Sequence, residues 1–161
     1  MRDKVWSNLA NVKFKAMYSY QYSRSADRIG RLTSWFLALA SASSVAAWAF
    51  WKAHPAIWGG IIAVSQVLQV TKPYLPVIGS DKELLEMSFD YEQLFLEYEK
   101  LWNEVESESV DEKAVTQRIE ELHKKALEIE RTHRNVHIPT RKRLSEQVYA
   151  DVEKFLKLNF G

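Results

Sequence analysis

Two uncharged segments occupy the middle of the chain: LTSWFLALASASSVAAWAFW at residues 32–51 and PAIWGGIIAVSQVLQVT at residues 55–71. Only Lys52-Ala53-His54 separates them. The hydrocarbon core of a bilayer is about 30 Å thick, which a helix of about 20 largely apolar residues can cross. The first segment has this length, and the second nearly has it when it continues to Tyr74. The pair therefore predicts a transmembrane helical hairpin over residues 32–74.

The composition of the hairpin is only weakly apolar. The first segment holds six Ala, four Ser and one Thr beside six Leu, Phe or Val residues. These six residues favour insertion by only about 2–4 kcal/mol, so a buried hairpin in a soluble protein is the alternative. The aromatic residues favour the membrane. Trp35 and Tyr74 lie at one end of the hairpin and Trp48, Trp51 and Trp58 at the other, the two levels at which such rings meet membrane interfaces.

Basic residues predict the orientation of the hairpin. Residues 1–31 carry seven Lys or Arg against Asp3 and Asp27, whereas the turn carries only Lys52. The positive-inside rule then places both termini in the cytoplasm. A secretory signal peptide is not expected, because the apolar segment starts beyond residue 30. The chain has no Cys, which agrees with cytoplasmic exposure.

Helical patterns flank the hairpin, so an all-α fold is predicted. Residues 1–31 predict an amphipathic cytoplasmic helix whose tyrosines lie near lipid headgroups. Residues 80–161 predict a cytoplasmic bundle or coiled coil of three helices, with Ser109 in a capping box at the start of the second. The first of these helices has an apolar seam with alternating spacings of three and four. This oligomer or bundle seam comprises Leu84, Met87, Tyr91, Leu94, Tyr98, Leu101 and Val105. Leu85, Phe95 and Trp102 widen it beyond what one partner helix would cover.

Charge is unevenly distributed over these segments. The formal charge is +5 for residues 1–31, −10 for residues 81–112 and +4 for residues 113–161. Opposite charges favour docking of these helices, either within one chain or between subunits. A solvated acidic helix face explains the pattern equally well.

Candidate sites for chemistry are few. His133 and His137 have the i, i+4 spacing of metal ligands, but Asn135 and Pro139 mark a helix end there, so no metal site is expected. No phosphate loop or activated nucleophile is recognisable, so neither an enzyme nor a cofactor is predicted. A basic run at a helix start is a candidate anion contact. It comprises Arg141, Lys142 and Arg143.

Polar residues within the two predicted spans are the second candidate site. Small and polar side chains allow close helix packing and hydrogen bonds across an interface, and they should not face lipid tails. Several hairpins packed together would shelter them, either in a dry interface or around water. The residues concerned are Ser41, Ser44, Ser65, Gln66 and Gln69.

Several N-terminal motifs resemble those of a known family. These motifs lead into the hairpin: Val5-Trp6, Lys13-Phe14-Lys15-Ala16, Arg24 and the run from Arg28 to Trp35. With these motifs followed by a two-span hairpin and a cytoplasmic helical region, the chain is similar to the SLATT-type two-transmembrane effectors of bacterial conflict and antiphage systems. The resemblance implies an effector that oligomerises and breaches the inner membrane when a separate sensor or signalling partner activates it. The family has no catalytic residue to carry over to this chain, and no fused sensor domain is obvious in this sequence.

The sequence thus predicts a membrane effector of the abortive-infection type, which contacts lipids, forms a homo-oligomer and opens a pore or disrupts the bilayer. Direct binding of nucleic acid is not expected. Two alternatives belong to other classes. One is a membrane-anchored helical scaffold that recruits a cytosolic partner, and the other is a soluble α-helical binding protein.

Overall fold

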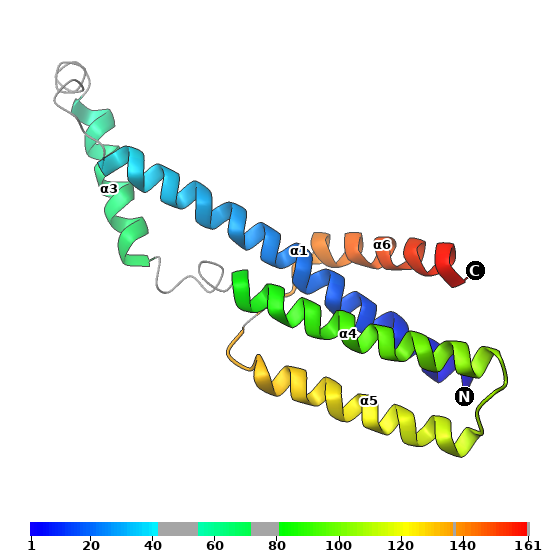
Figure 1. The fold of residues 1–161 in the computed structure, drawn as a ribbon. Helices are drawn as coiled ribbons and strands as arrows, with labels where there is room; N and C mark the ends of the chain where they lie inside the picture. Colours follow the sequence, from blue (N-terminus) through cyan, green and yellow to red (C-terminus); the bar gives the residue numbers. More distant parts are fainter. Residues whose placement is uncertain (42–54, 72–80, 137, 161) are drawn as a thin grey trace. The chain divides into compact units, whose positions relative to one another are not determined.

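The computed structural model describes residues 1–41, 55–71, 81–136 and 138–160. These residues form five helices and no strand, which confirms the predicted all-α class (Figure 1). The helices are α1 (Arg2–Ser41), α3 (Pro55–Thr71), α4 (Asp81–Glu106), α5 (Glu112–Thr132) and α6 (Lys142–Phe160).

The predicted transmembrane hairpin is described only in part. Of the first span, residues 32–41 belong to α1 and residues 42–51 lie outside the described residues. Of the second, α3 contains residues 55–71, and residues 72–74 are outside. Among the described helices, none combines the length and the apolar character needed to cross a membrane.

The chain divides into two compact units, and their boundary falls inside α1. The first unit combines residues 1–23 with residues 82–161, and the second comprises residues 24–81. The division into segments 1–31, 32–74 and 80–161 stays a prediction. The start of α1 belongs with the C-terminal helices, because its apolar side chains are buried there.

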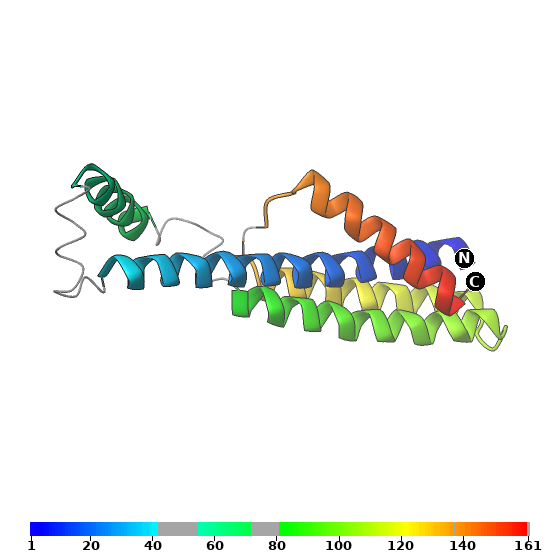
Figure 2. The ribbon, with the colours of Figure 1, turned by 90° about the horizontal axis from the view of Figure 1, so that it is seen from above.

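The first unit is a four-helix assembly arranged around α1 and α4. Both views show α4 and α5 as an antiparallel pair and α6 inclined to α1 (Figures 1 and 2). Ring contacts join α6 to both central helices: Trp6 contacts Phe160, and Phe95 contacts Phe155. The wide apolar face of α4 is thus covered by three helices of the same chain, as its two rows of apolar residues require.

Helical spacing explains which side chains of α1 enter this core. Positions separated by three or four residues lie on the same face of a helix, and burial follows this spacing. Buried apolar residues of α1 in the first unit are Val5, Leu9, Val12, Ala16, Tyr18 and Tyr22. The prediction that the tyrosines lie near lipid headgroups is therefore wrong for Tyr18 and Tyr22, since both pack inside the unit. Tyr20, on the other side of α1, is 43% exposed.

The turn between α4 and α5 is a Schellman motif. The N–H of Ser109 donates to the carbonyl of Glu104, and the N–H of Glu108 donates to that of Val105. Glu108 occupies the position that usually holds Gly and has a φ of 52°. The predicted capping box is wrong in register: Asp111 is the N-cap of α5, while the Ser109 hydroxyl donates to the Glu104 carbonyl.

Candidate functional site

The surface of α3 carries large aliphatic side chains and no charge. Its 17 residues include no Asp, Glu, Lys or Arg. Five of its aliphatic residues are between 49% and 67% exposed. They are Ile57, Ile62, Val64, Val67 and Val70. Exposed aliphatic side chains concentrated on one helix are typical of a protein–protein or membrane contact.

The exposed surface of α3 has two sectors. Val64, Val67 and Val70 recur every third residue and form one row. Gln66 and Gln69 form a polar pair beside the end of this row, since Gln66 lies four residues before Val70. Both glutamines are exposed in the single chain. Ser65 is buried, and its hydroxyl donates to the carbonyl of Ile61 at 2.7 Å. The structure therefore separates the predicted polar residues of this helix: Ser65 is satisfied internally, and the two glutamines are available to a partner.

The structure describes only part of the first span, so the predicted polar residues there are only partly described. Ser41 is the last residue of α1 and Ser44 lies outside the described residues. Nearer the start of this span, Leu32 and Trp35 are 71% and 69% exposed. The second unit thus has large apolar side chains on the surface of both its helices.

The seam of α4, by contrast, is interior. Six of its seven predicted members are buried and Val105 is half-buried. Burying a side chain of this size stabilises a fold by about 1.5–3 kcal/mol. Because one chain already covers the seam, these residues are not available to a second copy in this conformation.

Lys13 is a buried cation that sequence reasoning did not single out. Its ammonium lies 2.5 Å from a carboxylate oxygen of Glu92 in α4. It also lies 4.3 Å from the ring centroids of both Phe95 in α4 and Phe155 in α6. One charge thereby joins three helices. In the sequence, the opposite charges of residues 1–31 and 81–112 indicate that such pairs can form. The Lys13–Glu92 and Arg2–Glu106 pairs join these two segments within one chain.

Lys15 makes a second link, from α1 to α4 and α5. Its ammonium lies 2.7 Å from Glu130 and 5.3 Å from the ring centroid of Tyr91. Burial lowers the pKa of Lys15, but the hydrogen bond to Glu130 and the neighbouring Tyr91 outweigh it, so the pKa is raised. Burial raises the pKa of Tyr91, and the charge of Lys15 only partly opposes this. Nearby, burial raises the pKa of Tyr98 to about 12.

His133 is paired with a carboxylate of its own chain. Its Nε2 lies 2.8 Å from Oδ2 of Asp90, and its Nδ1 is buried without a hydrogen-bond partner among the described residues. His137 lies outside the described residues. In the part of the chain that is described, no three His, Cys, Asp or Glu side chains group together as metal ligands would. Glu130, three residues before His133, pairs with Lys15.

Arg141 holds the connection between α5 and α6 against α1. The Tyr18 hydroxyl donates to the carbonyl of Pro139 at 3.1 Å and accepts from the N–H of Arg141 at 2.9 Å. The Arg141 guanidinium lies 4.8 Å from the centroid of the Tyr22 ring. Of the predicted anion contact, Arg141 is therefore occupied in packing, while Lys142 and Arg143 are exposed.

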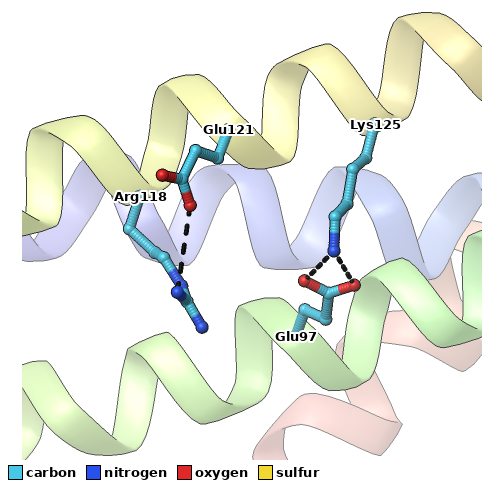
Figure 3. A network of polar contacts seen from close by, with 4 residues as sticks. All are labelled: Glu97, Arg118, Glu121 and Lys125. Atoms are coloured by element: carbon cyan, nitrogen blue, oxygen red, sulfur yellow. Dashed lines mark hydrogen bonds and ion pairs between the residues drawn. The ribbon is translucent and has the colours of Figure 1, made fainter.

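The outer side of α4 and α5 has a charged groove. Lys125 reaches across it to both carboxylate oxygens of Glu97, at 2.5 and 2.6 Å (Figure 3). About two turns earlier in α5, Arg118 lies 3.8 Å from Glu121 of the same helix. The groove has a volume of about 350 Å³. Exposed ion pairs of this kind are each worth about 0–1 kcal/mol, so the Lys125–Glu97 pair adds little to the stability of the contact between α4 and α5.

Comparison of the chain with protein-family models, with curated proteins and with solved structures finds no match.

Proposed function

We propose that the protein is a bacterial inner-membrane effector. In this proposal the hairpin of residues 32–74 inserts into the bilayer, copies of the chain associate, and the associated hairpins permeabilise the membrane. A separate sensor or signalling partner acts on the four-helix unit. The observation that carries the proposal is the exposed, charge-free surface of α3.

α3 would supply most, but not all, of the length of the second proposed span. Its 17 residues extend about 26 Å at about 1.5 Å per residue, against a hydrocarbon core of about 30 Å. The proposed span continues beyond α3 to Tyr74, outside the described residues. Lipid tails would cover the valine row without requiring any rearrangement of the helix.

The glutamine pair supports association of several hairpins. An amide group in hydrocarbon needs a hydrogen-bond partner or water, because desolvating it without one costs several kcal/mol. Gln66 and Gln69 are exposed in the single chain. In the membrane, a second hairpin or a water-filled path would supply hydrogen-bond partners for their amide groups. The α4 seam is covered within one chain, and subunit association is therefore assigned to the hairpin.

Membrane insertion is tested by substitution at the middle of the proposed span. Val64→Lys should move the chain from the carbonate-resistant membrane fraction to the supernatant, because Lys at the centre of a span costs about 2.5–3.5 kcal/mol. Leu127→Lys is the matched control. Leu127 is an exposed aliphatic residue of α5, and its substitution should not change the fraction. Recovery of the wild-type chain in the supernatant would favour a soluble binding protein and contradict the proposal.

Permeabilisation is tested by dye release from vesicles containing the full chain. Gln66→Leu with Gln69→Leu should keep the chain in the membrane and abolish dye release. Val67→Leu with Val70→Leu changes the same helix on the valine row and should leave release unchanged. Unchanged dye release in the glutamine variant would contradict the assignment of these residues to the pore. Stable insertion of the wild type without any release would favour the anchored scaffold.

A further inference from the structure

The part of α1 in the second unit has a row of arginines on one side. Arg24, Arg28 and Arg31 are separated by four and three residues, so they share one face of the helix. All three are exposed. Trp35 is four residues beyond Arg31, continues the same face and is 69% exposed. We call these four residues the arginine row.

The charge around this row is positive. Between residues 24 and 80 the chain has five Lys or Arg and a single acidic residue, Asp27. Asp27 pairs with Arg31 at 2.6 Å, and both side chains are exposed, at 41% and 67%. Water screens such a pair strongly, so it does not cancel the attraction of the row for an external anion.

We propose that the arginine row binds the headgroups of anionic phospholipids, such as phosphatidylglycerol, at the cytoplasmic surface of the bilayer. This inference rests on the membrane location in the proposed function and adds a lipid specificity to it. Arginine guanidinium groups form paired hydrogen bonds with phosphate oxygens. Trp35 and Leu32 then lie where the headgroup layer meets the hydrocarbon, the level that tryptophan favours.

The order of residues along α1 fits this occupant better than a soluble acidic partner. The arginines come first, and the exposed apolar side chains of Leu32 and Trp35 follow within about one helical turn. A membrane surface presents the same order, with phosphate outside and hydrocarbon beneath. An acidic protein or a nucleic acid would match the arginines alone.

Lipid selectivity of the full chain, reconstituted in phosphatidylcholine bilayers, provides the test. Spin-labelled phosphatidylglycerol and phosphatidylcholine report the ratio of the two association constants at the protein surface. One basic residue near an anionic surface is worth a factor of about five, so the wild type should prefer phosphatidylglycerol by about fivefold or more. Replacing Arg24, Arg28 and Arg31 by Gln, which has a similar helix propensity, should bring the ratio close to one.

A matched control removes the same charge from the other unit. Lys113→Gln, Lys124→Gln and Lys154→Gln change three exposed residues and should leave the ratio at the wild-type value. Raising the salt to about 1 M shortens the screening length to about 3 Å and should lower the wild-type ratio. A wild-type ratio of one, or an equal loss in both triple variants, would overturn the inference and would point to another anion.

Measuring dye release together with lipid selectivity distinguishes a failure of this inference from a failure of the proposed function. Wild-type selectivity without dye release would contradict the pore while supporting headgroup binding by the arginine row. Dye release without selectivity would overturn headgroup binding and leave the effector proposal standing.

Discussion

The ammonium of Lys13 in α1 lies 2.5 Å from the carboxylate of Glu92 in α4, yet the two side chains differ in environment. The Lys13 side chain is 9% exposed and the Glu92 side chain 42%. Removing one partner of a pair is costly when the remaining charge is buried. The two residues are therefore not equivalent, and the cost of each substitution depends on which charge remains.

Glu92→Gln should lower the free energy of unfolding by about 3 kcal/mol, because it leaves a buried ammonium without its counter-charge. Lys13→Met should change it by less than about 1 kcal/mol, since an apolar side chain of similar size fills the space between two phenylalanines and Glu92 remains hydrated. Urea unfolding of the full chain, followed by circular dichroism, measures both. A larger loss for Lys13→Met would contradict this assignment.

High pH should destabilise the first unit. The pKa of Tyr98 is raised from 10.0 to about 12 by burial, so the unfolded chain ionises first as the pH rises. The stabilisation is complete below about pH 10 and is lost between pH 10 and 12. The raised pKa values of Tyr91 and Lys15 act in the same direction, since both groups hold their protons more tightly when folded.

Unfolding experiments over this pH range measure the effect. Tyr98→Phe keeps the ring and removes one titrating group, so the dependence of unfolding free energy on pH should become less steep above pH 10. An unchanged slope would show that Tyr98 ionises normally in the folded chain, and tyrosinate absorbance measures that ionisation directly.

Glu108→Gly should stabilise the α4–α5 turn. Glu108 has a φ of 52°, a left-handed conformation that costs a residue with a Cβ about 1–2 kcal/mol. Glycine removes this cost but loses about 0.5–1 kcal/mol of chain entropy. We expect a net gain of about 0.5–1 kcal/mol in thermal unfolding experiments. Asn103→Gly, at an exposed site within α4, should instead lower stability slightly, by about 0.3 kcal/mol, because Gly is a poorer helix former than Asn.

Tyr18→Phe should loosen the connection between α5 and α6. The substitution removes the hydroxyl that bonds both the carbonyl of Pro139 and the N–H of Arg141. Losing these bonds should cost about 1–3 kcal/mol and speed hydrogen exchange at the Arg141 amide. Tyr149→Phe keeps the ring that stacks on Phe14 at 4.2 Å and changes an exposed hydroxyl, so it should have little effect. Equal exchange rates in the two variants would contradict the role of Tyr18.

The interior of the first unit was partly predictable from local patterns. Spacings of three and four along α4 identify one face of a helix whatever covers it, and Leu84 to Leu101 are buried on that face. The second apolar row indicated more than one covering helix, and three helices supply the cover. Short-range capping was less predictable: Ser109 and Asp111 are both good cap residues, and the Schellman turn decides between them.

The candidate sites depended more on long-range contacts. Lys13 looks like any basic residue of a surface helix until Phe95 and Phe155 enclose it. Arg141 belongs to a basic run that suggested an anion contact, but Tyr22 lies beneath its guanidinium. These neighbours come from helices distant in sequence, so no local spacing indicates them.

By itself, the sequence determined the all-α class, the faces of the helices and the charge-free character of residues 55–71, because these follow from side-chain chemistry and the 3.6-residue repeat. Only the tertiary structure decided that α1 divides between two units, that the α4 seam is covered by its own chain, and that Ser65 and the glutamines have different environments. The physical reason is that burial depends on which surfaces meet. The helical repeat specifies a face, and the packed chain specifies its partner.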